Sequence, residues 1–109
     1  MANLVILESA QRELEEIAQL HKNLVGPHLA RNITDLILDT LSHVEMFPLS
    51  GHIPRDKELR NGGYRYVIAG KYICMYRLIG EEVYVYHIAH GARNYPTLFK
   101  RLLKEDCLD

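Results

Sequence analysis

The stretch that decides the fold is Leu59–Phe99, which reads LRNGGYRYVIAGKYICMYRLIGEEVYVYHIAHGARNYPTLF. It contains three runs rich in tyrosine and β-branched residues, namely Tyr64–Ala69, Tyr72–Ile79 and Val83–His90. The breaks between these runs are Gly70-Lys71 and Gly80-Glu81-Glu82, which have the length and the glycine of tight hairpin turns. Runs of this composition, separated in this way, predict a three-stranded antiparallel meander.

Two consecutive helices are predicted upstream of the meander. Apolar residues recur at helical spacing over Ala10–Leu24 and again from Leu29 to Phe47, with Gly26-Pro27 as the break between them. Ser9 stands where an N-cap belongs, and Pro48 ends the second helix. We expect Glu13, Glu15 and Glu16 to face solvent, and the apolar face of this helical hairpin to cover a sheet.

The two ends of the chain complete the predicted order. The apolar run Asn3–Leu7 predicts an added buried strand, and the run from Tyr95 to Leu103 predicts a short terminal helix followed by a frayed tail, Lys104–Asp109. The order is β-α-α-β-β-β-(α). We expect one α+β domain over residues 1–109, a helical hairpin packed on a small twisted antiparallel sheet, and we place function on the face of the sheet that the hairpin leaves open.

Composition narrows the class of protein. The chain has 109 residues and a formal net charge of −1, whereas proteins that hold RNA through its phosphates usually carry a basic excess. No apolar run approaches the ~20 residues that span a bilayer, and Met1–Leu7 has no basic flank of a signal peptide, so we expect a cytoplasmic protein without membrane contact. Cys74 and Cys107 form no metal-ligand spacing, so we predict no metal, no cofactor and a buried Cys74.

Several pieces of the chain, in this order, resemble the RelE/ParE toxin superfamily. The pieces are Leu7–Ala10, Leu14–Ile17, Leu59-Arg60, Tyr72–Arg77, Val83–Ile88 and His90–Tyr95. The resemblance implies the toxin of a bacterial type II toxin–antitoxin system, bound and silenced by a cognate antitoxin whose C-terminal segment wraps it. It also implies a toxin–antitoxin hetero-oligomer that contacts operator DNA only through the antitoxin.

The resemblance allows two cellular targets for the toxin, mRNA in the ribosome and DNA gyrase. RelE-type members cut mRNA in the ribosome with basic residues on the open face of the sheet and often a C-terminal tyrosine or histidine. ParE-type members share the fold, lack that catalytic set and poison DNA gyrase. Cleavage needs a group that activates the 2′-hydroxyl, a group that protonates the leaving oxygen, and cations around the phosphate.

Two strand positions at which RelE-type toxins carry basic residues bear on this choice. Arg65 stands at one of them, but the next position on the same face is Val67. The RelE pattern has an arginine after the tyrosine that opens the second strand, whereas here Tyr72 is followed by Ile73. Part of the expected polar set is therefore apolar.

The region after the last strand is the second place where the family pattern tests the chain. Arg93 matches the family's arginine there, while Phe99 falls near the terminal aromatic acid–base and has no proton to give. Tyr95 lies close to that position but is displaced from it. If the chain is a nuclease, its candidate catalytic residues are Arg65, His90, Arg93 and Tyr95.

The apolar positions and the missing basic excess favour the ParE branch. The first prediction is therefore a gyrase poison that needs no catalytic residues, with a ribosome-dependent mRNA endoribonuclease as the alternative and a decayed toxin that keeps only antitoxin or operator binding as the third. The candidate target-binding residues are Arg60, Arg93, Lys100 and Arg101.

Each of the remaining polar residues also has a structural interpretation. Lys100 and Arg101 belong to a small basic cluster that could equally complement the helix dipole. His87 and His90 are three residues apart on one strand, so they should point to opposite faces and cannot bind one metal together. We expect His87 to be a core or interface histidine, and most strand tyrosines to form cross-strand packing pairs.

Overall fold

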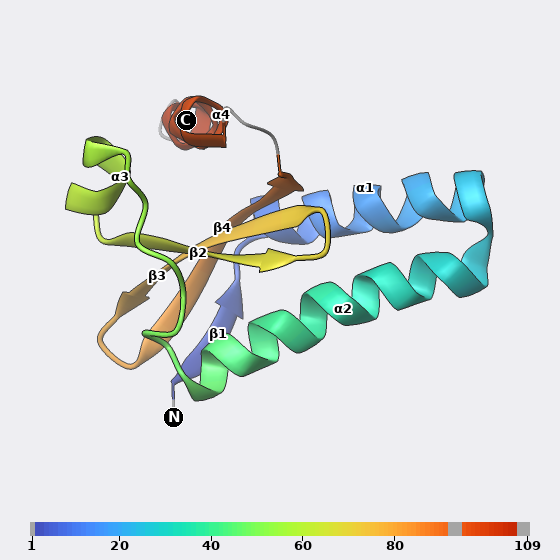
Figure 1. Cartoon of the computed structure of the whole chain (residues 1–109), viewed down its shortest axis with the longest axis horizontal. Helices are drawn as coiled ribbons and strands as arrows, with labels where there is room; N and C mark the ends of the chain where they lie inside the picture. Colours follow the sequence, from blue (N-terminus) through green and yellow to red (C-terminus); the bar gives the residue numbers. More distant parts are fainter. Residues whose placement is uncertain (1, 92–94, 107–109) are drawn as a thin grey trace.

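The computed structural model describes residues 2–91 and 95–106. The elements run β1 (Asn3–Ile6), α1 (Glu8–Val25), α2 (Pro27–Met46), α3 (Lys57–Asn61), β2 (Tyr64–Ala69), β3 (Tyr72–Ile79), β4 (Glu82–His90) and α4 (Tyr95–Asp106), as Figure 1 shows. This order confirms the predicted α+β arrangement and adds one short helix, α3.

The four strands form one sheet in the order β1-β4-β3-β2. Strands β2, β3 and β4 pair antiparallel, which confirms the meander, and β1 joins parallel to β4 from Asn3↔Glu82 to Ile6↔Val85. Between β3 and β4 the register shifts, because Met75 pairs with His87 whereas Tyr76 pairs with Val85. The extra residue, Tyr86, makes a bulge that changes which side chains of β4 face the helical hairpin.

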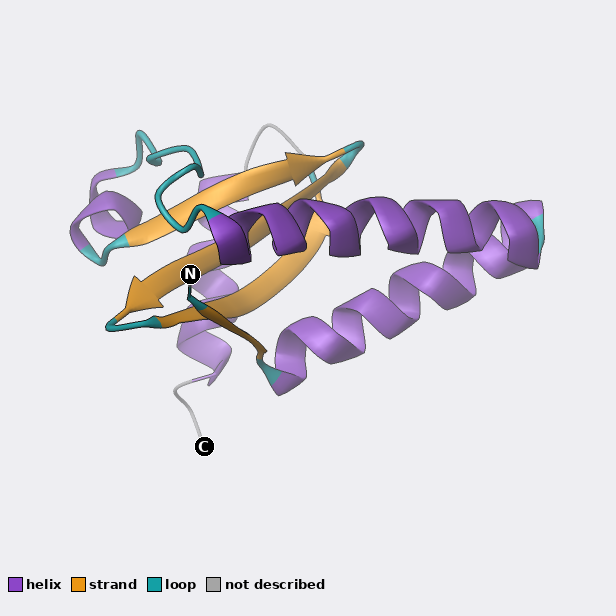
Figure 2. Ribbon diagram, turned by 90° about the horizontal axis from the view of Figure 1, so that it is seen from below, coloured by secondary structure: helices purple, strands orange, loops and turns teal. Residues whose placement is uncertain are grey.

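Helices α1 and α2 cover one face of the sheet (Figure 2). Ile37, Leu41 and Val44 of α2 are fully buried there against Tyr76 and Val85 of the strands. This cluster, which we call the first core, confirms that the hairpin buries an apolar stripe on the sheet, as amphipathic spacing predicts.

Several apolar residues of the predicted stripes are exposed instead. Leu24 and Leu29, at the tip of the hairpin, have 69% and 50% of their surface exposed, and Leu36 and Phe47 are also exposed. The tip projects beyond the end of the sheet (Figure 1), so no strand lies beneath it. Helical spacing identifies an apolar face but does not tell how far the sheet beneath it extends.

The predicted N-cap of the first helix is wrong. The helix begins at Glu8, its N-cap is Leu7, and no side chain caps it, so Ser9 lies inside the first turn. The Leu7 N–H donates to the carbonyl of Val85 at 3.1 Å, which keeps Leu7 in the extended conformation of the strand. Strand pairing, rather than a capping side chain, decides where this helix starts.

The second face of the sheet is covered as well, contrary to the expectation of an open face. Leu59 of α3 and Phe99 of α4 bury Ile73 and Met75 from that side, and we call these four residues the second core. Helix α4 continues to Asp106, so Lys104–Asp106 are helical where a frayed tail was expected. Residues 107–109, with Cys107, lie outside the described residues.

The short helix α3 was not predicted from the sequence, because five residues are too few to show the helical spacing of apolar residues. Its start depends on one contact, in which the Leu59 N–H donates to the side-chain carboxylate of Asp56 at 3.1 Å. This N-cap satisfies a backbone donor that the helix itself cannot pair. Leu59, the only residue of α3 that is buried, then points into the second core.

The loop between α2 and α3 is fastened to the sheet by Tyr76 and Arg65. The buried Tyr76 hydroxyl donates to the Pro48 carbonyl at 2.8 Å and accepts from the Gly51 N–H at 3.0 Å. A Cβ at Gly51 would collide with that hydroxyl, so the position requires glycine. Arg65 donates to the Gly51 carbonyl at 3.1 Å from the neighbouring strand.

We expect Tyr76→Phe to lower the free energy of unfolding by about 1–3 kcal/mol, because it leaves the buried Gly51 N–H and the part-buried Pro48 carbonyl without their partner. Urea unfolding of the full chain measures this change. The matched control is Tyr84→Phe on β4, a half-buried tyrosine, for which we expect a change below about 0.5 kcal/mol. Equal effects of the two substitutions would contradict the role given to the Tyr76 hydroxyl.

Candidate functional site

The candidate nuclease residues do not come together in the described part of the chain. On β2, Tyr64 and Tyr66 contact the second core while Val67 belongs to the first, so Arg65 points to the hairpin side. Tyr95, at the start of α4, packs against the second core on the opposite side. Arg93 lies outside the described residues.

His90 is separated from Arg65 along the sheet. It pairs with Tyr72, whose ring it approaches edge-on at 5.7 Å between centroids, whereas Arg65 pairs with Tyr76. Tyr72 and Tyr76 are four residues apart along β3, about 13 Å at the rise of a strand. Tyr72 also holds His21 of α1 through a 2.6 Å hydrogen bond, so His90 belongs to a histidine–tyrosine group on the hairpin side.

Tyr95 holds its proton tightly. Burial, together with a hydrogen bond to Tyr66, raises the pKa of Tyr95 to about 12. A general base works best when its pKa is close to the pH of the reaction. A phenol with a pKa of about 12 is protonated near neutral pH and therefore cannot act as a general base there. Its ring contacts are those of a packing residue, 5.1 Å from Tyr66 and 6.0 Å from Phe99 between centroids.

Three of the candidate target-binding residues lie on two neighbouring elements. Arg60 is on α3, and Lys100 and Arg101 are on α4. An ion pair of 2.9 Å between Lys100 and Asp56 joins α4 to the N-cap of α3, and it lowers the pKa of Asp56 and raises that of Lys100. The charge of Lys100 therefore has a structural partner, while Arg60 and Arg101 are exposed.

The charges of the chain are divided between its two sides. Helices α1 and α2 carry seven acidic and three basic residues. The side formed by α3 and α4 presents five exposed basic residues, which we call the α3–α4 surface: Arg55, Lys57, Arg60, Arg101 and Lys104. A net charge near zero thus conceals an acidic hairpin and a small basic excess on the α3–α4 surface, where Glu58, Glu105 and Asp106 are also exposed.

Arg77 of β3 is a residue that sequence analysis missed. Its guanidinium lies 4.8 Å from the centroid of the Tyr64 ring and 5.1 Å from that of Tyr86, and it donates to the Tyr86 hydroxyl at 2.7 Å. Arg77 also donates to the Gly62 carbonyl at 3.3 Å. Pairing of Arg77 with Tyr64 across the meander was the signal that could have identified this cation–π group.

Glu13 does not face solvent, so that prediction is wrong, although Glu15 and Glu16 are exposed as expected. The carboxylate of Glu13 accepts from the Ile88 N–H at 3.0 Å and lies 3.0 Å from Nδ1 of His87. Strand β1 ends at Ile6, so the edge of β4 beyond Val85 has no neighbouring strand, and Glu13 supplies the missing acceptor. The prediction that His87 is an interface histidine is confirmed, since it is 2% exposed between α1 and α4.

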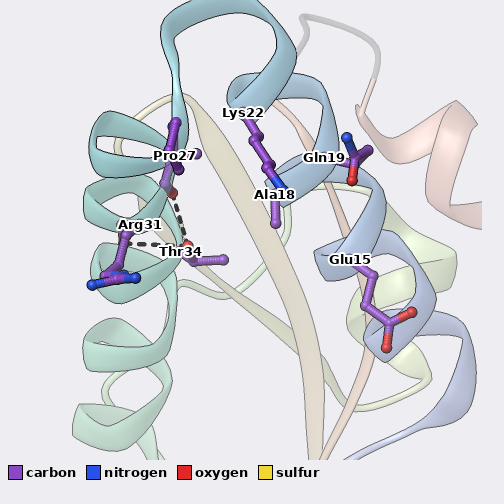
Figure 3. A pocket seen from close by; sticks show the side chains of 8 residues that line it. Glu15, Ala18, Gln19, Lys22, Pro27, Arg31 and Thr34 are labelled. Carbon is purple, nitrogen blue, oxygen red and sulfur yellow. Dashed lines mark hydrogen bonds between the residues drawn. The ribbon is translucent and has the colours of Figure 1, made fainter.

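The outer surface of the hairpin has a shallow groove between α1 and α2, with a volume of about 350 Å³ (Figure 3). Small side chains form part of its lining, including Ala18, Ala30 and Thr34. The Thr34 hydroxyl donates to the carbonyl of Ala30 at 2.8 Å, so it is turned back onto its own helix. Glu15 and Arg31 lie at opposite sides of the groove, one on each helix.

Other kinds of site are missing from residues 2–91 and 95–106. Within these ranges no three His, Cys, Asp or Glu side chains are placed to hold a metal ion. No helix in the described part of the chain has the length and apolar character required to cross a membrane. Cys74 is fully buried, as predicted, and burial raises the pKa of its thiol to about 12, so it is not a reactive nucleophile.

Two solved structures share this fold. One is from the chromosomal ParDE toxin–antitoxin system of P. aeruginosa, with 18% identity and a TM-score of 0.71 over 84% of this chain and 98% of that chain. The other is from the toxin–antitoxin complex RelBE2 of Mycobacterium tuberculosis, with 20% identity and a TM-score of 0.54 over 83% of this chain and 98% of that one. None of the curated proteins matches the sequence.

The sequence itself carries the family assignment. Residues 4–95, from β1 to the start of α4, match the family of the ParE toxin of the type II toxin–antitoxin system. This match includes the meander and both helices of the hairpin, and it confirms the resemblance to the RelE/ParE superfamily on its ParE side. The chain belongs to the ParE family of toxins of type II toxin–antitoxin systems.

Proposed function

We propose that this toxin acts by binding a target protein, DNA gyrase, and not by cleaving RNA. The observation that carries the proposal is the separation of Arg65, His90 and Tyr95. General acid–base cleavage requires its groups within hydrogen-bond reach of one phosphodiester. Here Arg65 and Tyr95 point to opposite faces of the sheet, and His90 pairs with β3 at a different position from Arg65.

The chemistry of the individual groups supports the same proposal. Arg65 donates to the carbonyls of Gly51 and Leu49, so its guanidinium is engaged in holding the loop. The ring of Tyr95 packs against Tyr66 and Phe99, so Tyr95 is engaged in the second core. The second face of the sheet, which would have to admit the RNA, is occupied by the buried side chains of Leu59 and Phe99.

The α3–α4 surface is the candidate contact for gyrase. Arg60 and Arg101 are exposed on it, and the side chain of Arg101 is 67% exposed and lies 3.8 Å from the carboxylate of Glu105. Arginine is enriched at the energetic centres of protein interfaces, because its planar guanidinium makes several directed hydrogen bonds. An acidic patch on the target would complement this surface.

We expect the purified toxin to inhibit supercoiling by gyrase and to accumulate cleaved DNA, and to leave ribosome-bound mRNA intact. Reversing two charges, with Arg60→Glu and Arg101→Glu together, should weaken gyrase inhibition by roughly tenfold or more, the loss of one strong interface contact. Arg31→Glu, an exposed arginine on α2, is the matched control and should inhibit like the original chain.

The opposite results would overturn the proposal. Codon-specific mRNA cleavage that disappears in Arg93→Ala, with supercoiling unaffected, would establish the endoribonuclease. Growth that continues normally when the chain is expressed, with antitoxin binding retained, would instead establish a decayed toxin.

We further propose that the antitoxin covers the exposed apolar residues of the hairpin. Leu24, Leu29 and Leu36 are exposed, and Leu29 and Leu36 are seven residues apart on one face of α2. Exposed apolar side chains that gather on one face often mark a protein–protein contact. An amphipathic antitoxin helix could lie along this face of α2, near the tip of the hairpin.

The competing arrangement is an antitoxin strand added to the outer edge of β2 near the exposed Ile68, beyond the point where His52 already pairs with Tyr66. Calorimetric titration with the antitoxin encoded beside the toxin distinguishes the two. We expect Leu24→Glu with Leu29→Glu to weaken binding by about 100-fold, since two desolvated anchors cost some 3 kcal/mol. Ile68→Lys should leave the affinity within about threefold of the original value. The reverse pattern would assign the antitoxin to the edge of β2.

A further inference from the structure

A buried histidine joins three elements of the fold. Nδ1 of His87, on β4, lies 3.0 Å from Oε2 of Glu13 on α1. Its other ring nitrogen, Nε2, lies 2.8 Å from Oδ2 of Asp106 in the last turn of α4. The imidazole is almost completely buried, while the side chain of Asp106 is 38% exposed.

Both contacts can be hydrogen bonds only if the group holds one proton more than a neutral imidazole. A neutral imidazole has a single N–H, and ionised carboxylates only accept. With His87 neutral, one of its nitrogens would present a lone pair to a carboxylate oxygen, which is repulsive. The imidazolium donates from both nitrogens and satisfies both carboxylates.

The groups around His87 all favour this proton. Helix α1 presents Glu13, and α4 presents Asp106, which also accepts from the Ser9 hydroxyl at 3.4 Å. Strand β3 presents apolar Met75 opposite His87 and, near Glu13, the neutral thiol of Cys74. Burial lowers the pKa of His87, and the hydrogen bonds and charges of Glu13 and Asp106 outweigh this effect, so that the pKa is raised above its ordinary value.

The contact with Asp106 matters for α4 in particular. A carboxylate in the last turn of a helix is disfavoured by the negative end of the helix dipole. Nearer its N-terminus α4 is held by the buried Phe99 and by the Lys100–Asp56 ion pair, neither of which depends on His87. The position of the last turn, in contrast, depends on whether Nε2 of His87 presents an N–H or a lone pair to the Asp106 carboxylate.

We propose that His87 is a protonation-dependent latch, which holds the C-terminal half of α4 on the sheet when it is charged and releases it when it is neutral. Docking is then strongest below the pKa that histidine has when α4 is detached. It weakens as pH rises through the higher pKa of the docked form.

The latch controls access to an apolar cleft. A cavity of about 530 Å³ lies between α1, the end of β4 and α4, and its walls include Leu20, Ala89, Leu98 and Leu102. Glu13 lines the same cavity, so the latch stands at its edge. Release of the last turn of α4 widens this cleft and exposes the adjoining part of the second core.

The protonation state is tested directly by nitrogen NMR of the His87 ring in the full chain, titrated from about pH 5.5 to about pH 8.5, the range in which histidine changes charge. We expect both ring nitrogens to be protonated at the acidic end, and the midpoint to lie above the ordinary histidine pKa of about 6.5. A neutral ring with one tautomer over the whole range would overturn the latch.

Docking is tested by hydrogen exchange of the amides of residues 102–106, corrected for the intrinsic effect of pH. Protection should fall as pH rises, by up to about tenfold for each unit by which docking raises the His87 pKa. The change should disappear in His87→Gln, and in Asp106→Asn, because the amide of asparagine can either donate to or accept from the ring.

Matched controls separate this latch from general effects of pH. His28→Gln removes an exposed imidazole from α2 and should keep the full pH dependence. Amides of α2 should show no comparable change. The proposal would be overturned if amide protection in the original chain did not depend on pH, or if it changed with pH to the same extent in Asp106→Asn. Because Asp106 is exposed, this variant can be tested even if His87→Gln fails to fold.

Discussion

Burial of β3 on both of its faces is the constraint on which the rest of the structure depends. Five successive residues of this strand, Tyr72–Tyr76, are buried, so neither face of the sheet can remain open along it. The hairpin covers one face, but a two-layer fold would leave Ile73 and Met75 in water. Helices α3 and α4 supply the third layer, and the sheet is enclosed from both sides.

The local parts of this architecture could be predicted from sequence, and the non-local parts could not. The meander, the hairpin and its break at Gly26-Pro27 follow from residue type and spacing over short windows. The position of α4 depends instead on where Phe99 finds an apolar partner, and α3 depends on one N-cap at Asp56. Neither dependence leaves a periodic pattern in the sequence.

The candidate site shows the same division. Exposed Arg60 and Arg101 were selected as target contacts, and the structure places them on adjoining helices, with Lys100 engaged by Asp56. The proposed acid–base residues were chosen because they match positions of the family pattern. Such a match gives a residue's place along a strand, but the face of the sheet to which its side chain points depends on the register of the strand. Arg65 falls on the hairpin side, so its neighbours are the loop carbonyls that it binds.

The shortness of β1 explains the most polar group in the interior. Because β1 ends at Ile6, its pairing with β4 stops at Val85, and the Ile88 N–H farther along β4 has no strand to which it can donate. A buried backbone donor must nevertheless be paired. Glu13 provides an acceptor but brings a charge, which needs a cation in a partly buried site. His87 meets that need only when protonated, and its second N–H can then hold Asp106 of α4. The unpaired edge of β4 thus links α1, β4 and α4 through one proton on His87. This link depends on the length and register of the strands, which residue spacing alone does not reveal.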